Sequence, residues 1–421
     1  MAVAKLSLVA PRADQTGGDV SSIERDVSTS SSARTEQQSG ERLGGRRFAF
    51  VDALRGIAAV GVAAYHIDRY GPLPGAAASV VPKFVNSALH HGWVGVQMFF
   101  VISGFVIAYT LRGARVTPRY LGNFALRRSL RLDPPYWFTM LFVIGLYVLT
   151  TSLFNIEHGL MDEAPTWDQV LAHLFYMQNI LGYHNLSAGF WTLCIEVQFY
   201  ILFAVLLGFA QRLTAHCSDR AQGAHWLPLL LTYAPLAVAS LFWFSHDVDN
   251  TDWVVHFFAF FFFGALAWWT LEGRMPRPAF WAFAAAIVLR QWIHGTLDMW
   301  VALATGLAIY GVIRAGRSDL WPRLRWLERL GLISYSLYLI HYPVSWIITT
   351  LGYELTGTAP VAAVFWLVLS LAASIGVAHA LHMAIESPAI RFARRFSGFG
   401  GDRRVASTAG ASLPILAEPL R

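Results

Sequence analysis

An arginine and a histidine lie inside an otherwise apolar stretch near the start of the chain. Arg55 and His66 belong to the segment FVDALRGIAAVGVAAYHI, with ten residues between them. Eleven steps along a helix return to nearly the same face about 16 Å further along the axis. A guanidinium in lipid is costly, so it normally faces a protein interior or a watered cavity and marks function. The pair therefore indicates a membrane enzyme or carrier.

A carboxylate lies in a second apolar stretch, GFWTLCIEVQFYILF, at Glu196. A carboxylate within a membrane must find a partner or become protonated, because leaving it charged in lipid is expensive. We expect His66 or an arginine to be that partner. A purely structural ion pair between helices is the alternative, since such pairs also hold buried charges.

Two further arginines lie in FALRRSLRLDPPYW, directly before a third apolar stretch. Arg128 and Arg131 are about one helical turn apart, and the fork of an arginine side chain suits phosphate. Basic residues at the cytoplasmic ends of membrane spans provide an alternative explanation. With Arg55, however, they suggest a phosphate-rich ligand that is held at the cytoplasmic side and extends a thin arm toward His66.

A fourth polar group occurs in LISYSLYLIHYP, where Tyr335, Tyr338 and His341 are three residues apart. That spacing places them on one broad helix face. Taken alone, His341 is better interpreted as a hydrogen-bonded histidine between helices than as a catalyst.

The composition places these residues in a membrane protein. Of 421 residues, 55% are hydrophobic and only 14% are charged, far from the average of soluble domains. The formal net charge is +6, but the basic residues fall between apolar stretches as topology signals, so we expect no nucleic-acid partner. Cys194 and Cys217 give neither a metal-ligand spacing nor a disulfide framework. We expect a multi-pass protein surrounded by membrane lipid, with no metal.

Apolar windows long enough to cross about 30 Å of hydrocarbon predict the spans. They lie at about 48–68, 92–111, 134–154, 189–210, 226–245, 253–270, 277–293, 298–314, 332–352 and 360–384. The stretch 168–183 is too interrupted for a span and suggests an interfacial or re-entrant helix. We therefore expect an all-α integral membrane protein with about ten transmembrane helices.

Charge asymmetry predicts the orientation. Every second connection is rich in arginine, and arginine and lysine concentrate on the cytoplasmic side. Both termini are then cytoplasmic, which places Arg55 in the inner half of the first span and His66 near its outer end. We expect a disordered cytoplasmic N-terminal tail at 1–45, a membrane-embedded core at 46–395, and a flexible cytoplasmic C-terminal tail at 396–421.

Six segments, in order, carry a resemblance to a known family: VDALRGIAAVGVAAYH, GWVGVQMFFVISGFVI, RRSLRLDPPYW, FWTLCIEVQFY, GLISYSLYLIHYP and ALHMAIESPAIRFARR. From Phe50 to about Arg395 the chain resembles the acyltransferase-3 family of bacterial membrane acyltransferases. The resemblance implies a ten-helix core that takes an acyl group, usually acetyl, from cytosolic acyl-CoA. It further implies delivery to a hydroxyl of a cell-envelope glycan, a lipid-linked saccharide or a small natural product.

The family's motifs transfer residue by residue. Its Arg-x10-His pattern falls on Arg55 and His66, and its Arg-x-x-Arg pattern falls on Arg128 and Arg131. Its Trp-Ser-Leu segment reads Trp191, Thr192 and Leu193 here, and the threonine keeps the hydroxyl. The remaining candidates for substrate contact or a structural polar role are Ser103, Trp191, Thr192, Tyr338 and His341. Gly104, beside Ser103, would let two backbones pack closely.

These observations lead to a hypothesis for the reaction. His66 is the general base on the acceptor hydroxyl, because neutral imidazole suits proton removal near pH 7. Glu196 orients or assists it, while Arg55, Arg128 and Arg131 hold the phosphates of acyl-CoA, most simply acetyl-CoA, as a donor substrate rather than a tightly bound cofactor. An acyl intermediate on Cys194 is less well supported, because nothing in the sequence orients that thiol toward a base.

Other functions stay open at this point. A carrier of a glycan or an acyl-group intermediate, without transfer chemistry of its own, would also line its pathway with buried charges. A membrane sensor that binds acyl-CoA or a glycan without chemistry is a further possible function. Many members of the family carry an extracytoplasmic hydrolase-like domain after the core, and we expect this chain either to transfer directly or to use a separate extracytoplasmic partner. A glycan acceptor and arginine-biased connections fit a bacterial inner membrane.

Overall fold

The computed structural model describes residues 48–154, 160–161, 163–217, 225–246, 251–316 and 325–395. Within these ranges all regular secondary structure is helical and no strand is present. The chain is therefore an all-α membrane protein, as the apolar windows predict. The predicted tails at 1–45 and 396–421 lie outside the described residues.

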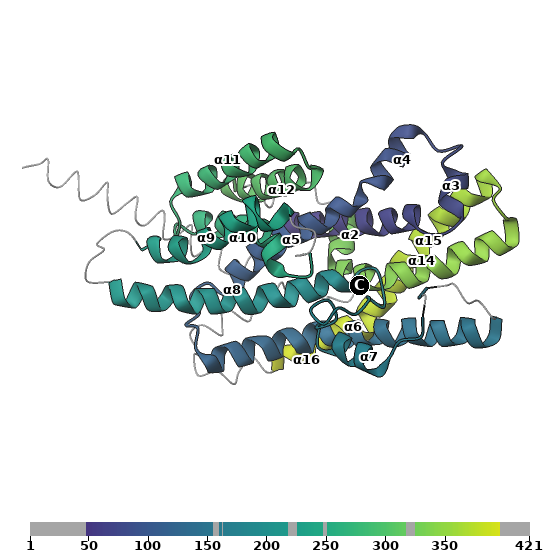
Figure 1. Ribbon diagram of the computed structural model, residues 1–421, viewed down its shortest axis with the longest axis horizontal. Coiled ribbons are helices and arrows are strands. Elements are labelled where there is room, and N and C mark those ends of the chain that lie inside the picture. The colour runs from purple at the N-terminus through teal and green to yellow at the C-terminus, as the bar shows by residue number, and fades with distance from the viewer. Residues whose placement is uncertain are drawn as a thin grey trace, which may run out of the picture. The chain divides into compact units, whose positions relative to one another are not determined.

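Each predicted window coincides with a long helix (Figure 1). These helices are α2 (Ala49–Arg69), α5 (Gly95–Thr110), α6 (Pro118–Phe154), α8 (Phe190–Cys217), α9 (Leu227–Phe242), α10 (Val254–Leu271), α11 (Arg277–His294), α12 (Leu297–Arg314), α14 (Ser334–Thr356) and α15 (Pro360–Leu381). Shorter elements connect them: α3 (Leu73–Ala77), α4 (Lys83–His90), the 3-10 turns η1 (Gly92–Val94) and η2 (Phe244–His246), α7 (Trp167–Leu174), α13 (Arg325–Leu332), the π-helix η5 (His382–Glu386) and α16 (Ser387–Arg395).

Seven helices of the described chain are long and apolar enough to cross a membrane. They lie at Ala49–Arg69, Lys83–Thr110, Pro118–Ser152, Phe190–His216, Val254–Leu271, Leu297–Arg314 and Pro360–Arg395. Helix α9 is apolar but shorter, and α14 carries polar residues along its length, Ser336, His341 and Ser345 among them. The protein is a multi-pass membrane protein, while ten spans with both termini cytoplasmic remains a prediction.

Helix α6 differs from the prediction at its start. It begins at Pro118 and continues through Pro134 and Pro135, where the sequence suggests a basic connection followed by a span from 134. Two successive prolines remove two backbone donors. Nearby hydroxyls bond to this part of the helix, because Tyr335 donates to the Leu132 carbonyl (2.8 Å) and Thr139 donates to the Pro135 carbonyl (2.9 Å). The arginines predicted to precede a span therefore lie within a long helix.

The interrupted stretch at 168–183 forms only a short helix. Helix α7 has 8 residues, which cover about 12 Å and cannot cross a membrane. Thr166 and Gln169 form a reciprocal capping box at its first turn. This stretch adds no span to the fold, which agrees with excluding it from the span count.

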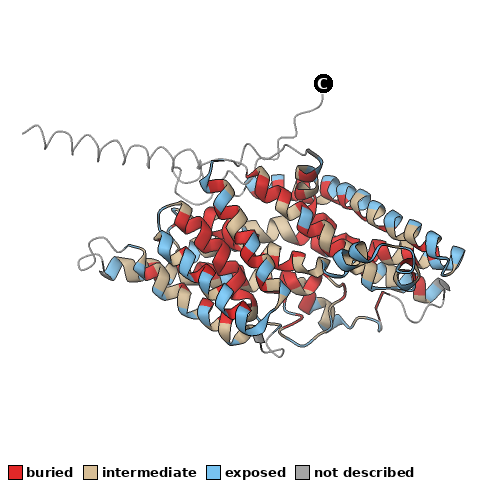
Figure 2. Cartoon of the chain, turned by 90° about the horizontal axis from the view of Figure 1, so that it is seen from above, coloured by how far each residue is buried: buried red, intermediate tan, exposed pale blue. Residues whose placement is uncertain are grey.

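The core is built around α10, of which 83% is buried. Figure 2 shows buried residues along the inward faces of the helices and exposed residues along the outward faces. Helices α5 and α10 touch backbone to backbone, since a Cβ atom on Gly104 would overlap the Phe261 carbonyl and one on Gly264 would overlap the Val101 carbonyl. This is the close approach predicted for Gly104, and it fixes the neighbouring Ser103.

The outermost long helix has the opposite character. Only 22% of the α15 region is buried, and large apolar side chains such as Val361, Phe365 and Val368 are exposed on it. Exposed apolar surface of this kind suits contact with lipid rather than water. The chemistry must therefore be sought between the inner helices.

Candidate functional site

A pocket of about 100 Å³ lies between α2, α5, α6, α8 and α14. Eight of the polar residues that the sequence singles out belong to its wall: Arg55, Ser103, Arg128, Arg131, Thr192, Glu196, Tyr335 and Tyr338. Most of the remaining wall is apolar, including Val96, Phe99 and Phe100. A mainly apolar pocket with a few convergent polar groups is the usual form of a small-ligand site. We call it the arginine pocket.

The arginine pocket contains hydrogen-bond donors that the described protein does not satisfy. Arg128 Nε, Arg131 Nε and Ser334 Oγ are buried and have no hydrogen-bond partner. The guanidinium of Arg128 also stacks on the Tyr200 ring, 3.8 Å from its centroid. Three arginines face one carboxylate in the wall, so the pocket is positively charged. Buried unsatisfied guanidinium donors are suited to an anionic ligand, phosphate above all.

Glu196 has partners other than those predicted. Its Oε1 accepts a hydrogen bond from Ser103 Oγ (2.8 Å) and another from the Tyr200 hydroxyl. No ion pair joins Glu196 to His66 or to an arginine among the residues that the structure describes. The expected pairing is therefore wrong. Neutral hydroxyls from α5 and α8 bond to this carboxylate instead.

Thr192 and Tyr338 join α8 to α14 at the pocket wall. Their hydroxyl oxygens are 2.7 Å apart, and the Thr192 hydroxyl also lies 3.0 Å from the Gly189 carbonyl. The Tyr338 ring packs edge-on against Phe99. Trp191 is not part of the wall and packs against Phe257 instead, with ring centroids 5.7 Å apart. The threonine hydroxyl thus serves a contact between helices, whereas Trp191 belongs to the apolar packing of α10.

His66 lies outside the pocket wall and touches a second histidine. His66 Nδ1 is 3.0 Å from His341 Nε2 and 3.0 Å from the Val62 carbonyl oxygen. His341 is fully buried, and its Nδ1 is 3.0 Å from the Leu337 carbonyl oxygen. We call His66 and His341 the histidine pair. A contact between residues on α2 and α14 cannot be read from local spacing, and it places His341 beside the predicted base.

Helix α14 connects the pocket to the histidine pair. Ser334, Tyr335 and Tyr338 belong to the pocket wall, and His341 lies three residues further along the same helix. The rings of Tyr338 and His341 are 6.0 Å apart between centroids. Seven residues of helix advance about 10 Å, so one face of α14 leads from the arginines toward His66.

Aromatic rings surround His66. Tyr65 and Tyr342 approach its ring edge-on, with centroids 5.3 and 6.1 Å away, and Tyr70 stacks on it at 5.8 Å. Tyr70 is exposed, with 47% of its surface accessible. The end of α2 therefore presents the histidine between aromatic faces at the edge of the fold.

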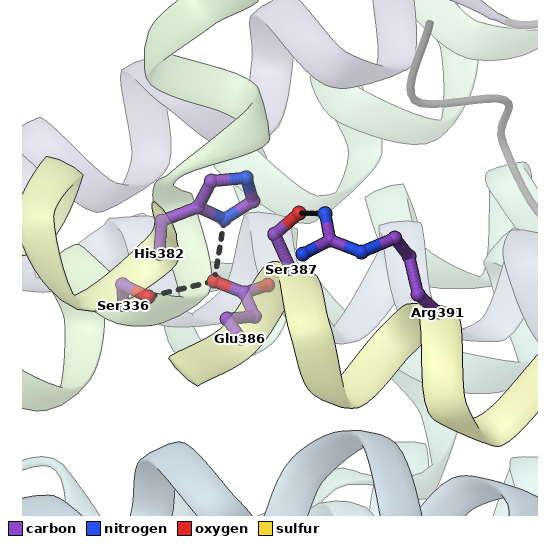
Figure 3. A network of polar contacts seen from close by, with 5 residues as sticks. All are labelled: Ser336, His382, Glu386, Ser387 and Arg391. Atoms are coloured by element: carbon purple, nitrogen blue, oxygen red, sulfur yellow. Dashed lines mark hydrogen bonds and ion pairs between the residues drawn. The ribbon is translucent and has the colours of Figure 1, made fainter. Parts of the chain in front are cut away.

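A second polar cluster lies where η5 meets α14 (Figure 3). Ser336 Oγ donates to Glu386 Oε2 (2.6 Å), and His382 Nδ1 is 2.9 Å from the same oxygen. One turn along α16, Arg391 donates to the Ser387 hydroxyl (2.8 Å). Glu386 is buried and interacts electrostatically with Arg131. A π-helix turn often marks a functional region, and this one places a carboxylate behind the arginine pocket.

Sequence reasoning did not assign this cluster, nor Tyr200 and Ser334. The signals were present as a glutamate at the end of an apolar window and a tyrosine one turn after Glu196. The glutamate and the tyrosine can be identified from the sequence only if every polar residue in a predicted span is treated as a candidate site residue. Within the described ranges, no three histidine, cysteine or acidic side chains converge to hold a metal ion.

Comparisons with known proteins agree with this architecture. The family described as an acyltransferase domain matches residues 48–381. Nodulation protein 10 of Rhizobium leguminosarum bv. viciae is 25% identical over 310 residues, which cover 65% of this chain and 79% of that protein. O-acetyltransferase OatA of Staphylococcus aureus (strain NCTC 8325 / PS 47) is 29% identical over 172 residues, which cover 38% of this chain and only 24% of that protein. No solved structure is significantly similar.

The family match spans most of the chain, including every helix from α2 to α15. The protein therefore belongs to the acyltransferase-3 family. It is a multi-pass membrane acyltransferase.

Proposed function

We propose that the protein is an O-acyltransferase that moves an acyl group, acetyl in the first instance, from cytosolic acyl-CoA to a hydroxyl group. The acceptor class is a cell-envelope glycan, a lipid-linked saccharide or a small natural product. The observation that carries this proposal is the arginine pocket, in which Arg128 Nε and Arg131 Nε are buried donors without an acceptor among the described residues. The name of the relative OatA supports O-acetyl transfer.

The donor is held by its phosphates in this proposal. Arg128 and Arg131 present their unsatisfied donors to phosphate oxygens, and Arg55 adds a third positive charge from α2. The pantetheine arm then follows α14 past Tyr338 and brings its thioester near His66. The apolar pocket wall suits that arm, whereas free phosphate would use the arginines alone.

The reaction takes place at His66. Its imidazole removes the proton from the acceptor hydroxyl while the oxygen attacks the thioester carbonyl carbon. The carbon–sulfur bond then breaks, and the departing CoA thiolate takes its proton from the His66 imidazolium, which returns the histidine to its neutral form. The products are the acyl ester and CoA. Acceptor activation and donor binding are therefore assigned to two different parts of the bundle.

The acceptor approaches the end of α2 at which Tyr70 is exposed and stacks on His66. Aromatic faces of this kind pack well against sugar rings. With the predicted orientation, this end faces outward from a bacterial inner membrane, and the core at 46–395 lies between two cytoplasmic tails. The enzyme then transfers the acyl group to the acceptor directly or hands it to a separate extracytoplasmic partner.

The test is CoA release by the purified protein in lipid, with acetyl-CoA as donor and an extract of envelope glycans as acceptor. We expect release that requires the acceptor, together with an added acetyl mass on one glycan fraction. A carrier or a sensor would bind a ligand without releasing CoA above background. Acceptor-independent release at the same rate would also contradict the proposal, because it would be hydrolysis rather than transfer.

A further inference from the structure

The histidine pair has a hydrogen-bond pattern that is satisfied in only one way. Each histidine directs its Nδ1 at a main-chain carbonyl oxygen one turn earlier, Val62 for His66 and Leu337 for His341, at 3.0 Å in both cases. A carbonyl oxygen only accepts hydrogen bonds, so each Nδ1 must carry the proton if its lone pair is not to face the oxygen lone pairs. In the alternative tautomers, each unprotonated Nδ1 would face a carbonyl oxygen, so that two hydrogen-bond acceptors would lie against each other in both contacts.

The contact between the two rings follows from this assignment. With its proton on Nδ1, neutral His341 has an unprotonated Nε2 that accepts a hydrogen bond. His66 Nδ1 lies 3.0 Å from that nitrogen, and its single N–H is shared between His341 Nε2 and the Val62 carbonyl. This is a three-centre hydrogen bond, in which one N–H is shared by two acceptors. The other ring nitrogen, His66 Nε2, is then left with a free lone pair.

We infer that His341 is the positioning residue that fixes His66 in the tautomer with the proton on Nδ1, so that His66 Nε2 is the atom that accepts the acceptor's proton. The inference rests on the proposed transferase function for its kinetic consequence, but the tautomer itself does not depend on that function. His341 thus takes the place that the sequence suggests for Glu196, which is bound to Ser103 and Tyr200 instead.

The surroundings of His341 suit this role. The residue is completely buried on α14, and its own Nδ1 is anchored to the Leu337 carbonyl. Tyr338 lies against one side of its ring, 6.0 Å between centroids. Because an uncharged imidazole orients His66, no second charge has to be placed in the membrane interior, where a carboxylate would be costly.

The test compares three variants of the purified protein in lipid. His341→Phe removes the acceptor while keeping a ring. His341→Gln keeps an acceptor, the carboxamide oxygen, and serves as the conservative rescue. Ser345→Ala is the matched control, since Ser345 is a buried polar residue one turn further along α14 whose hydroxyl bonds the Tyr342 carbonyl. Each variant is measured for kcat, for the KM of acetyl-CoA and for thermal stability.

We expect His341→Phe to lower kcat about 10- to 100-fold, the scale of losing the orientation of a general base. The KM for acetyl-CoA should stay within about twofold, since the donor is bound at the arginine pocket. His341→Gln should recover a large part of kcat, and Ser345→Ala should match the native protein. Native kcat in His341→Phe, or an equal loss in Ser345→Ala, would overturn the inference.

A second measurement works without turnover. Nitrogen-15 NMR of histidine-labelled protein distinguishes Nδ1–H from Nε2–H imidazoles, and the His66 signals are those missing from His66→Ala. We expect the Nδ1–H form in the native protein and a mixture of tautomers in His341→Phe. An Nε2–H form in the native protein would refute the inference even if the transferase is active. Absence of any CoA release would refute the proposed function. The NMR measurement of the His66 tautomer would then decide by itself whether His341 fixes that tautomer.

Discussion

The arginine pocket and the histidine pair both place polar side chains inside a membrane bundle. They differ in whether the hydrogen-bonding groups of those side chains have partners. Within the part of the chain that the structure describes, the arginine pocket leaves Arg128 Nε and Arg131 Nε buried without a hydrogen-bond partner. The histidine pair gives each Nδ1 a carbonyl partner and joins the two rings. Unsatisfied buried donors favour binding of an incoming acceptor, whereas a satisfied pair favours one fixed geometry. The difference separates a region for binding from a region for chemistry.

The supporting elements differ in the same sense. The arginine pocket takes its charges from α2 and from the long proline-containing helix α6, and Glu386 on η5 lies behind it. The histidine pair takes one residue from α2 and one from the buried face of α14. Helices α2 and α14 contribute to both regions, α2 through Arg55 and His66 and α14 through Tyr338 and His341, but neither histidine lines the pocket. Changes in the two regions should therefore affect different kinetic constants.

The largest expected effect comes from His66→Ala. Removing the proposed base should lower CoA release by about 10²–10⁴-fold, the usual contribution of general base catalysis. Acetyl-CoA binding should remain within about twofold of the native value, because the arginines are untouched. Parallel turnover and equilibrium binding assays check this. A variant that turns over normally would show that the chemistry lies elsewhere in the bundle.

A smaller effect with the opposite signature is expected from Arg131→Ala and Arg128→Ala. Each should raise the KM of acetyl-CoA about 10- to 100-fold, because hydrogen bonds to charged groups contribute about 1.5–3 kcal/mol. Saturating donor should restore most of kcat. Arg127→Ala is the matched control, since Arg127 is on the same helix but outside the pocket wall. Equal KM effects at all three positions would indicate a general surface field instead of a pocket.

The packing that holds Ser103 beside Glu196 gives a third prediction. Gly104→Ala should lower the free energy of unfolding by about 1–3 kcal/mol, because the added Cβ overlaps the Phe261 carbonyl on α10. Thermal unfolding in lipid measures the change. Gly145→Ala on α6 is the control, since a Cβ there meets nothing within 4 Å. If both variants melted together, the close approach of α5 and α10 would not be needed for the fold.

The smallest effect concerns a histidine outside the spans. On α7, burial lowers the pKa of His173 below its ordinary value of 6.5. Its Nδ1 donates to the Gln169 carbonyl (2.8 Å), and its Nε2 accepts from the Leu186 N–H (3.1 Å). As the pH falls through 6.5, His173 takes up a proton in the unfolded chain at a higher pH than in the folded chain. Stability from neutral His173 is therefore full above that pH and is lost as the pH falls further.

Thermal unfolding at about pH 7.5 and about pH 5.5 tests this, on either side of the ordinary histidine pKa. The native protein should lose more stability on acidification than His173→Gln, and the exposed His184→Gln should behave like the native protein. The same loss in all three proteins would mean that other groups cause it. His173 resembles His341, because its Nδ1 faces a carbonyl oxygen and its Nε2 accepts a hydrogen bond. The experiment therefore also tests the assignment of the proton to Nδ1.

Local patterns predicted the helices because each apolar window is long and continuous. The same patterns grouped Arg55, Arg128 and Arg131, which line one pocket. This grouping could be made from the sequence because it depends only on the residue type and on the predicted position of each arginine along its span. The continuation of α6 through Pro134 and Pro135 was not predicted, because prolines normally end a helix.

Partners could not be predicted where they depend on how helices pack. Glu196 bonds to Ser103, which is 93 residues away, and His66 contacts His341, which is 275 residues away. No periodicity within one span encodes such contacts, so the expectation that Glu196 pairs with His66 was wrong. The backbone contact between Gly104 and α10 brings Ser103 to Glu196, which explains the error physically.

The most direct test of the division between binding and chemistry uses three proteins in the same lipid: native, His66→Ala and Arg131→Ala. Acetyl-CoA affinity and acceptor-dependent CoA release are measured on each. The division predicts that His66→Ala binds like the native protein without turning over, and that Arg131→Ala binds weakly but turns over at saturating donor. If His66→Ala lost binding, or Arg131→Ala bound normally, the two regions would not have the separate roles assigned to them.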